Sequence, residues 1–188
     1  ASAWFRASPH DDTDRRWLRV YLACATVLLI ATPLAGSHGD YGAYQRFWGR
    51  VRDGADPWAG TPVHAYGPLF NLFAVVTPLS WLAPKVLFVF GHVLALSRLT
   101  LVIAARVSRG PALGIAVLGV LHPVVWIEQA FWGNFDVLVG GACLLAVDQC
   151  LRGRDRSAGA WLAAGAGLKM LPILLVPPLL VDRGRWRI

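Results

Sequence analysis

The chain has 188 residues, of which 56% are hydrophobic and only 15% are charged. A soluble domain carries about a quarter charged residues, and the apolar residues here come in long blocks rather than at amphipathic spacing. The net charge of +7 would suggest nucleic acid in a soluble protein. Its arginines instead cluster between the apolar blocks, where they set topology and contact anionic lipid. The composition therefore indicates an all-α, polytopic membrane protein without a nucleic-acid partner.

The first part of the chain divides into three segments. Residues 1–16 are polar and are expected to form a cytoplasmic lead, and residues 17–35 have about the 20 residues that a membrane-crossing helix needs. Residues 36–66 then form a polar loop, predicted to lie outside the cytoplasm. Aromatic and apolar residues recur in this loop at a spacing of three to four: Tyr41, Tyr44, Phe47, Trp48 and Val51. This spacing predicts an amphipathic helix in the membrane interface, with Arg46 on its wet side.

Further apolar blocks follow at residues 68–83, 86–105, 111–127, 135–151 and 158–181. They predict about five to seven membrane segments in a single transmembrane domain, residues 17–188. The chain begins at Ala1 and stops just after a basic cluster, so we expect a fragment of a longer protein.

Orientation favours one of two layouts. Strict alternation from a cytoplasmic N-terminus would place the arginine clusters at 106–109 and 152–156 outside, against the positive-inside rule. The favoured layout makes residues 68–83 re-entrant and folds 158–181 into a hairpin near Pro172. It also places the loop around Asp136 on the same side as Asp40.

Asp40 comes just after the first apolar block, where the chain has left the bilayer. A carboxylate held at the membrane surface is where an enzyme with a lipid-linked substrate would keep its base. The alternative is an interfacial acid that caps the loop helix. Tyr44 lies one helical turn after Asp40 and shares its face, which favours the functional interpretation.

Several other polar residues lie in or beside apolar blocks, where ionisable groups usually have a partner or a function. Lys169 ends a glycine-rich stretch, and its ammonium can meet a phosphate or carboxylate or can snorkel to the surface. Snorkelling is the favoured interpretation for Arg98. Asn134 and Asp136 belong to a turn that either lines a sugar pocket or caps the next helix.

Two further predictions concern His64 and Asp148. His64 flanks the polar loop and is a candidate substrate contact. Asp148 precedes Arg152 by four residues and is expected to form a surface ion pair.

In their order along the chain, these motifs resemble the GT-C superfamily of membrane glycosyltransferases, and most closely glycosyltransferase family 87. In that family an Asp, often with a Tyr four residues later, opens the first outer loop, as Asp40 and Tyr44 do here. A Tyr-Pro-Pro-Leu-like return follows; here it reads Tyr66-Gly67-Pro68-Leu69, with Gly in place of the first Pro. A Gly-Gln-x-Asn/Asp-like loop corresponds to residues 133–136, and a glycine-rich helix ending in Lys and Pro to residues 165–172.

The resemblance implies transfer of a sugar, mannose in the first instance, from a polyprenyl-phosphate donor to a lipid or glycan hydroxyl. Asp40 would be the general base, and Lys169 would stabilise the leaving phosphate, with Arg46 as an alternative cation. The implied substrate contacts are Tyr44, His64, Tyr66, Asn134, Asp136, Lys169 and Arg46. The other implied partners are membrane lipids in a bacterial plasma membrane, and no metal or cofactor is expected.

Two other classes remain as alternatives. Lys169, Arg98 and Asp136 could line the path of a transporter, whose critical charges lie near the midplane. A fragment with too few spans for a complete substrate groove could instead be a non-catalytic scaffold.

Overall fold

The computed structural model describes residues 12–59, 66–105 and 109–181, and within these ranges all regular structure is helical. The N-terminal half contains α2 (Asp12–Leu34), α3 (Asp40–Arg52), the 3₁₀ helix η1 (Pro68–Val75) and α4 (Ala83–Ala104). The C-terminal half contains α5 (Arg109–Leu121), α6 (Pro123–Val125), the π-helix η2 (Trp126–Phe131), α7 (Asp136–Leu151), α8 (Asp155–Leu168), η3 (Leu171–Leu175) and α9 (Val176–Val181).

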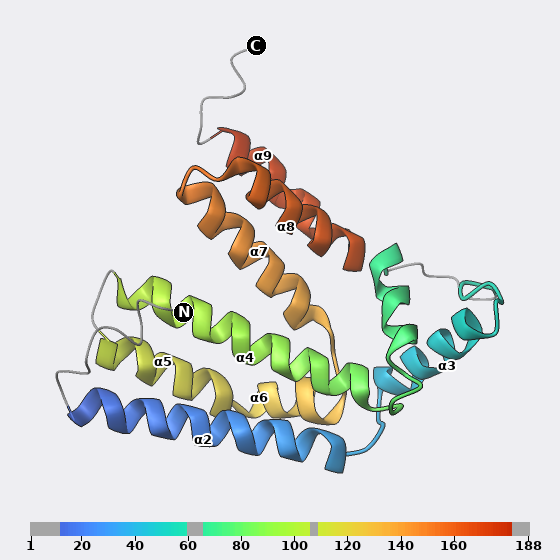
Figure 1. The fold of residues 1–188 in the computed structure, drawn as a ribbon, viewed down its shortest axis with the longest axis horizontal. Coiled ribbons are helices and arrows are strands. Elements are labelled where there is room, and N and C mark those ends of the chain that lie inside the picture. Colours follow the sequence, from blue (N-terminus) through green and yellow to red (C-terminus); the bar gives the residue numbers. More distant parts are fainter. Residues whose placement is uncertain (1–11, 60–65, 106–108, 182–188) are drawn as a thin grey trace.

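The helices form two groups that pack against each other. Figure 1 shows α2, α4 and α5 side by side, while α7, α8 and α9 form the second group. Packing of α4 on α7 joins the groups, and α3 with η1 lies at one end of both. That end collects the start of α3, the start of α7 and the end of α8.

Helix boundaries follow local chemistry. Gly39, with φ of 53°, precedes α3, and the carboxylate of Asp40 then lies in the first turn, where it complements the helix dipole. Pro68 and Pro84 lie in the first turns of η1 and α4, where the missing N–H costs little. Pro123 ends α5, and the His122 imidazole accepts a hydrogen bond from the Val124 N–H at the break.

Two helices in the described residues are long and apolar enough to cross a membrane: residues 15–34 of α2, and α4. A third span results if α5 and the segment from Pro123 to Phe131, bent by 47°, are counted as one. The predicted five to seven segments are therefore not confirmed. The 16 residues of α7 give about 24 Å at 1.5 Å per residue, short of a hydrocarbon core of about 30 Å.

The last apolar block folds back on itself, as the favoured layout requires. Lys169 has an extended backbone that ends α8. The chain then returns through η3 and α9, which lie against α8 (Figure 1). At the bend, the Pro172 ring packs against Gly165.

Two cores hold the molecule together. An aromatic core joins α3, η1, α4 and α7, and its buried members are Tyr41, Tyr44, Phe47, Trp48, Phe70, Ala74, Phe88, Phe135 and Val139. The second core joins α2, α4, α5 and η2, and contains Tyr21, Leu28, Val89, Ala116, Val117, Val120 and Ala130. The aromatic residues of the loop helix are thus buried within the protein. An amphipathic helix lying in a membrane interface is not confirmed.

Candidate active site

A pair of tyrosines lies at the centre of the end where α3, α7 and α8 meet. The rings of Tyr44 and Tyr66 are 5.5 Å apart and nearly perpendicular, and the Tyr44 hydroxyl is hydrogen-bonded to the Tyr66 hydroxyl. Both rings pack against Phe135, at 5.7 and 5.4 Å. Tyr44 is 3% exposed and Tyr66 is half-buried, so only Tyr66 offers much surface to a ligand.

The pKa shifts of Tyr44 and Tyr66 show which charged residues lie near the two phenols. Burial raises the pKa of the Tyr44 phenol, and Tyr66 and the carboxylates of Asp40 and Asp136 raise it further. Burial also raises the pKa of Tyr66, and so do the carboxylates of Asp40 and Asp136, while the hydrogen bond from Tyr44 and the ammonium of Lys169 lower it. Asp40, Asp136 and Lys169 therefore all lie within electrostatic range of one phenol, although 129 positions separate the first from the last.

Asp40 is exposed at the start of α3. The N-cap of α3 is Gly39, which has no side chain to cap the helix, and Asp40 lies after it in the first turn. The capping alternative is thus reduced to a favourable charge in the first helical turn, and the carboxylate is open to a ligand.

Lys169 and Asp136 form an ion pair across two helices. The Lys169 Nζ donates to Oδ1 of Asp136 at 2.7 Å and to Oδ2 at 2.9 Å. The ammonium also lies 5.9 Å from the centre of the Phe135 ring. The Lys169 side chain is 25% exposed and that of Asp136 is 46% exposed. Of the interpretations left open from the sequence, the structure selects a carboxylate partner for Lys169.

Gly67 brings the return segment against the end of α8. Its N–H donates to the Leu168 carbonyl at 2.8 Å, and a Cβ at this position would lie 2.3 Å from the Gly167 oxygen. A proline here would clash and would lack the donor. The departure from the Tyr-Pro-Pro-Leu pattern therefore matches a close approach that places Tyr66 beside Lys169.

Asn134 fixes the loop that carries Asp136. Its Oδ1 accepts from the Asp136 N–H at 3.0 Å, and its Nδ2 donates to Oε2 of Glu128 at 3.1 Å. Both ends of the amide are thus used in holding the turn before α7. A contact between Asn134 and substrate stays a prediction.

Among the predicted site residues that the structure describes, one is not brought into this cluster. Arg46 is exposed on α3 with its guanidinium near Gly42, and it lines a separate open pocket with Arg50 and Asp53. His64 lies outside the described residues.

The structure adds two residues that the sequence analysis missed. Asn71 lines an open cleft of about 510 Å³ beside Tyr66, together with Trp58, and its buried Oδ1 has no hydrogen-bond partner in the described structure. Lys85 is fully buried at the start of α4. In the sequence, Lys85 could have been noticed because it follows Pro84 at the start of an apolar block.

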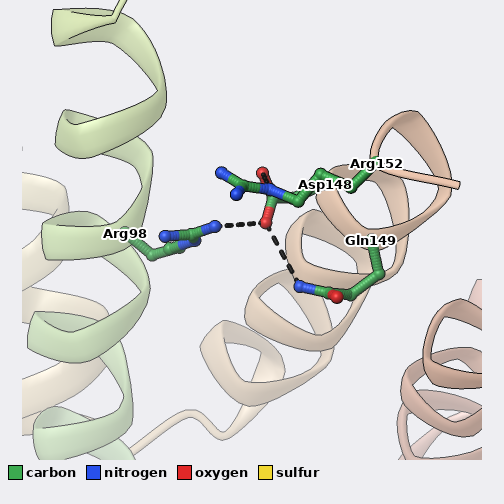
Figure 2. Close-up of polar contacts among 4 residues, drawn as sticks. All are labelled: Arg98, Asp148, Gln149 and Arg152. Atoms are coloured by element: carbon green, nitrogen blue, oxygen red, sulfur yellow. Dashed lines mark hydrogen bonds and ion pairs between the residues drawn. The ribbon is translucent and has the colours of Figure 1, made fainter. Parts of the chain in front are cut away.

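A second polar cluster lies toward the other end of α7 (Figure 2). Asp148, 7% exposed, accepts from Arg98, from Arg152 at 3.0 Å and from Gln149 at 3.3 Å. The predicted ion pair of Asp148 with Arg152 is confirmed, but Asp148 itself is buried and does not lie at the surface. Arg98, for which snorkelling was the favoured interpretation, is paired with Asp148. Asp136 and Asp148 are about 18 Å apart along the helix at 1.5 Å per residue. The charges proposed for a transport path are therefore divided between two sites.

Comparison with known proteins agrees with the resemblance drawn from the motifs. The profile of glycosyltransferase family 87 matches residues 64–188, a region that contains Tyr66, Asn134, Asp136 and Lys169, whereas Asp40 and Tyr44 precede it. Comparisons with curated proteins and with solved structures give no match. Since the matched region covers well over half of the chain, the protein belongs to glycosyltransferase family 87 and is a membrane glycosyltransferase.

Proposed function

We propose that this protein transfers a sugar, mannose in the first instance, from a polyprenyl phosphate to a hydroxyl of a lipid or glycan acceptor. The observation that carries the proposal is the ion pair of Lys169 and Asp136 beside Tyr66, with Asp40 within electrostatic range of the same phenol. Asp40 is an exposed carboxylate and Lys169 is a cation, and both lie at the same end of an apolar helical bundle. A lipid-linked phosphate sugar needs both within reach of the membrane surface.

In the proposed reaction, Asp40 accepts the proton of the acceptor hydroxyl as its oxygen attacks the anomeric carbon. The bond from that carbon to the phosphate oxygen breaks, and the polyprenyl phosphate leaves with the electron pair. One direct displacement inverts the anomeric configuration. Lys169 stabilises the charge that develops on the phosphate, while Asp136 holds the ammonium in position until the phosphate arrives.

The cleft beside Tyr66 is the proposed acceptor side. Its lining includes the half-buried Trp58, whose ring can stack on a sugar face, and Asn71. Arg46 remains an alternative phosphate contact.

The decisive experiment measures transfer from polyprenyl-phosphate mannose in membranes that contain the full-length protein, comparing wild type with Asp40→Asn. The substitution keeps the shape and removes the base, so we expect a loss of about a hundredfold or more. Asp53→Asn is the matched control, because Asp53 is an exposed acid at the opposite end of the same helix. It should leave the rate unchanged, and a selective loss in Asp53→Asn would instead point to the pocket that Asp53 shares with Arg46.

The remaining outcomes separate the parts of the proposal. Equal rates for wild type and Asp40→Asn would remove Asp40 as the base and make Asp136 the next candidate. No transfer by wild type from mannose, glucose or other polyprenyl-phosphate sugars would overturn the donor class.

A further inference from the structure

We propose that Lys85 is a positioning residue: its buried ammonium holds the two loops that carry Asp40 and Asp136 in one arrangement. Lys85 lies in the first turn of α4 and is 0% exposed. The expected effect of Lys85 on the rate of sugar transfer rests on the proposed function. Its expected effect on the order of the two loops does not.

The ammonium joins two segments that are distant in sequence. Its Nζ donates to the Gly36 carbonyl at 2.7 Å and to the Phe131 carbonyl at 3.1 Å. Gly36 follows the end of α2, four positions before Asp40, and Phe131 ends the π-helix, five positions before Asp136. One side chain of α4 therefore satisfies a carbonyl in each of the two loops.

The same lysine supports α3 and the turn before α7. The ammonium lies 5.6 Å from the centre of the Tyr41 ring, and the Lys85 backbone N–H donates to the Tyr41 hydroxyl at 3.2 Å. Tyr41 in turn donates to the Trp81 carbonyl at 2.8 Å. Gly133 packs directly on Tyr41 and on the aliphatic part of Lys85.

The loop after α2 and the loop after η2 also contact each other directly. The rings of His38 and Phe131 are stacked, with centres 4.3 Å apart, and Gly39 packs against the Trp132 ring. These contacts are made by side chains, whereas the ammonium bonds directly to a backbone carbonyl of each loop. The hydrogen bonds of the ammonium fix the relative position of their backbones.

The cost of burying this charge argues that the arrangement matters. Within the described ranges, no carboxylate lies within ion-pair distance of Lys85. A buried ammonium without a counter-ion is expensive, and hydrogen bonds to carbonyls and a ring face offset only part of that cost. An apolar side chain would fill the same space more cheaply, but it would leave the carbonyls of Gly36 and Phe131 without a donor.

The test compares Lys85→Met, which keeps the length of the side chain and removes the donor, with Lys85→Arg, which restores donors and charge. Lys85→Gln is a milder second variant in case Lys85→Met folds poorly. Thr100→Val is the matched control, because it removes a buried polar group of the same helix that bonds only to the Leu96 carbonyl. Each full-length variant is measured by hydrogen exchange and by sugar transfer.

For Lys85→Met we expect faster exchange in residues 36–40 and 131–136, with the central turns of α5 and α7 unchanged. A displacement of about 1 Å at a reacting group costs about a hundredfold in rate, so kcat should fall by about that factor with KM little changed. Lys85→Arg should recover part of kcat, and Thr100→Val should behave as wild type.

Three results would overturn the inference. They are wild-type kcat in Lys85→Met, exchange that rises evenly over all helices, or a loss of folded protein whose remaining fraction has normal kcat. If wild type transfers no sugar from any polyprenyl-phosphate donor, the proposed function fails. The exchange measurement then decides the role of Lys85 by itself.

Discussion

The ammonium of Lys169 donates to both carboxylate oxygens of Asp136, at 2.7 and 2.9 Å, across 33 positions of sequence. The pair joins the end of α8 to the start of α7 and lies within electrostatic range of the Tyr66 phenol. Because the Asp136 side chain is nearly half-exposed, solvent screens the attraction. The pair is therefore better suited to meeting a ligand than to stabilising the fold.

Lys169→Met should separate these two roles. An exposed ion pair contributes at most about 1 kcal/mol, so the free energy of unfolding should change by less than that. In the proposed mechanism Lys169 stabilises the leaving phosphate, so its loss should lower kcat by about a hundredfold or more. Lys169→Arg keeps the charge and should retain more activity than Lys169→Met. Denaturant titration and transfer assays on the same samples check both expectations, and a large stability loss with normal kcat would contradict them.

Asp148→Ala should lower the free energy of unfolding and leave kcat unchanged. Its removal leaves the guanidiniums of Arg98 and Arg152, which are 28% and 48% exposed, without their shared acceptor, which should cost about 2 kcal/mol of unfolding free energy. Arg152→Ala is the control: the Arg152 side chain is 48% exposed, so its loss should cost about 1 kcal/mol or less. Folded Asp148→Ala protein should keep its kcat, because the cluster lies about 18 Å along α7 from Asp136. A selective loss of kcat would place this cluster in the transfer site.

Gly133→Ala tests the turn that precedes α7. Gly133 has φ of +66°, and a Cβ there would lie 2.7 Å from Cδ2 of Tyr41. Left-handed backbone and overpacking together should cost about 2 to 3 kcal/mol. Gly140→Ala, in the α7 interior where a Cβ meets nothing within 4 Å, should instead stabilise by about 0.5 to 1 kcal/mol. Thermal unfolding of both variants gives the comparison, and equal midpoints would contradict it.

The tyrosine pair predicts a pH dependence of stability. Burial raises the pKa of Tyr44 and Tyr66 above their ordinary value, so the unfolded chain releases these protons first as pH rises. Their contribution to stability is therefore complete below about pH 10 and falls above it, toward the folded-state pKa. Tyr44→Phe should reduce the slope of unfolding free energy against pH between about pH 10 and 12. An unchanged slope would show that Tyr44 does not contribute to it.

Part of the candidate site could be proposed from the sequence, because its residues stand at recognisable places along the chain. Asp40 and Tyr44 were identified by their position after the first apolar block and their helical spacing. Asp136 and Lys169 were identified as polar residues at the edges of apolar helices. The hairpin of residues 158–181 was predicted from Pro172 and the arginines on both sides of that block. The structure contains this hairpin, formed by α8, η3 and α9.

Other features could not be predicted, because they depend on which helices are neighbours. Arg98 was expected to snorkel, since the sequence does not show that Asp148 of α7 faces α4. Lys85 was missed because its acceptors are two backbone carbonyls, and every residue has one. The buried positions of Tyr41 and Trp48 depend on η1 and α4 covering a face that was expected to meet the membrane.

The sequence by itself determined an all-helical membrane protein, its family and the residue types of its site. Composition, hydropathy blocks and motif order are properties of the chain taken one segment at a time. Only the tertiary structure decided that Lys169 pairs with Asp136, that Gly67 rests on the end of α8 and that Lys85 joins the two loops. The physical reason is that each of these contacts joins segments tens of residues apart, and their geometry is set by how the helices pack.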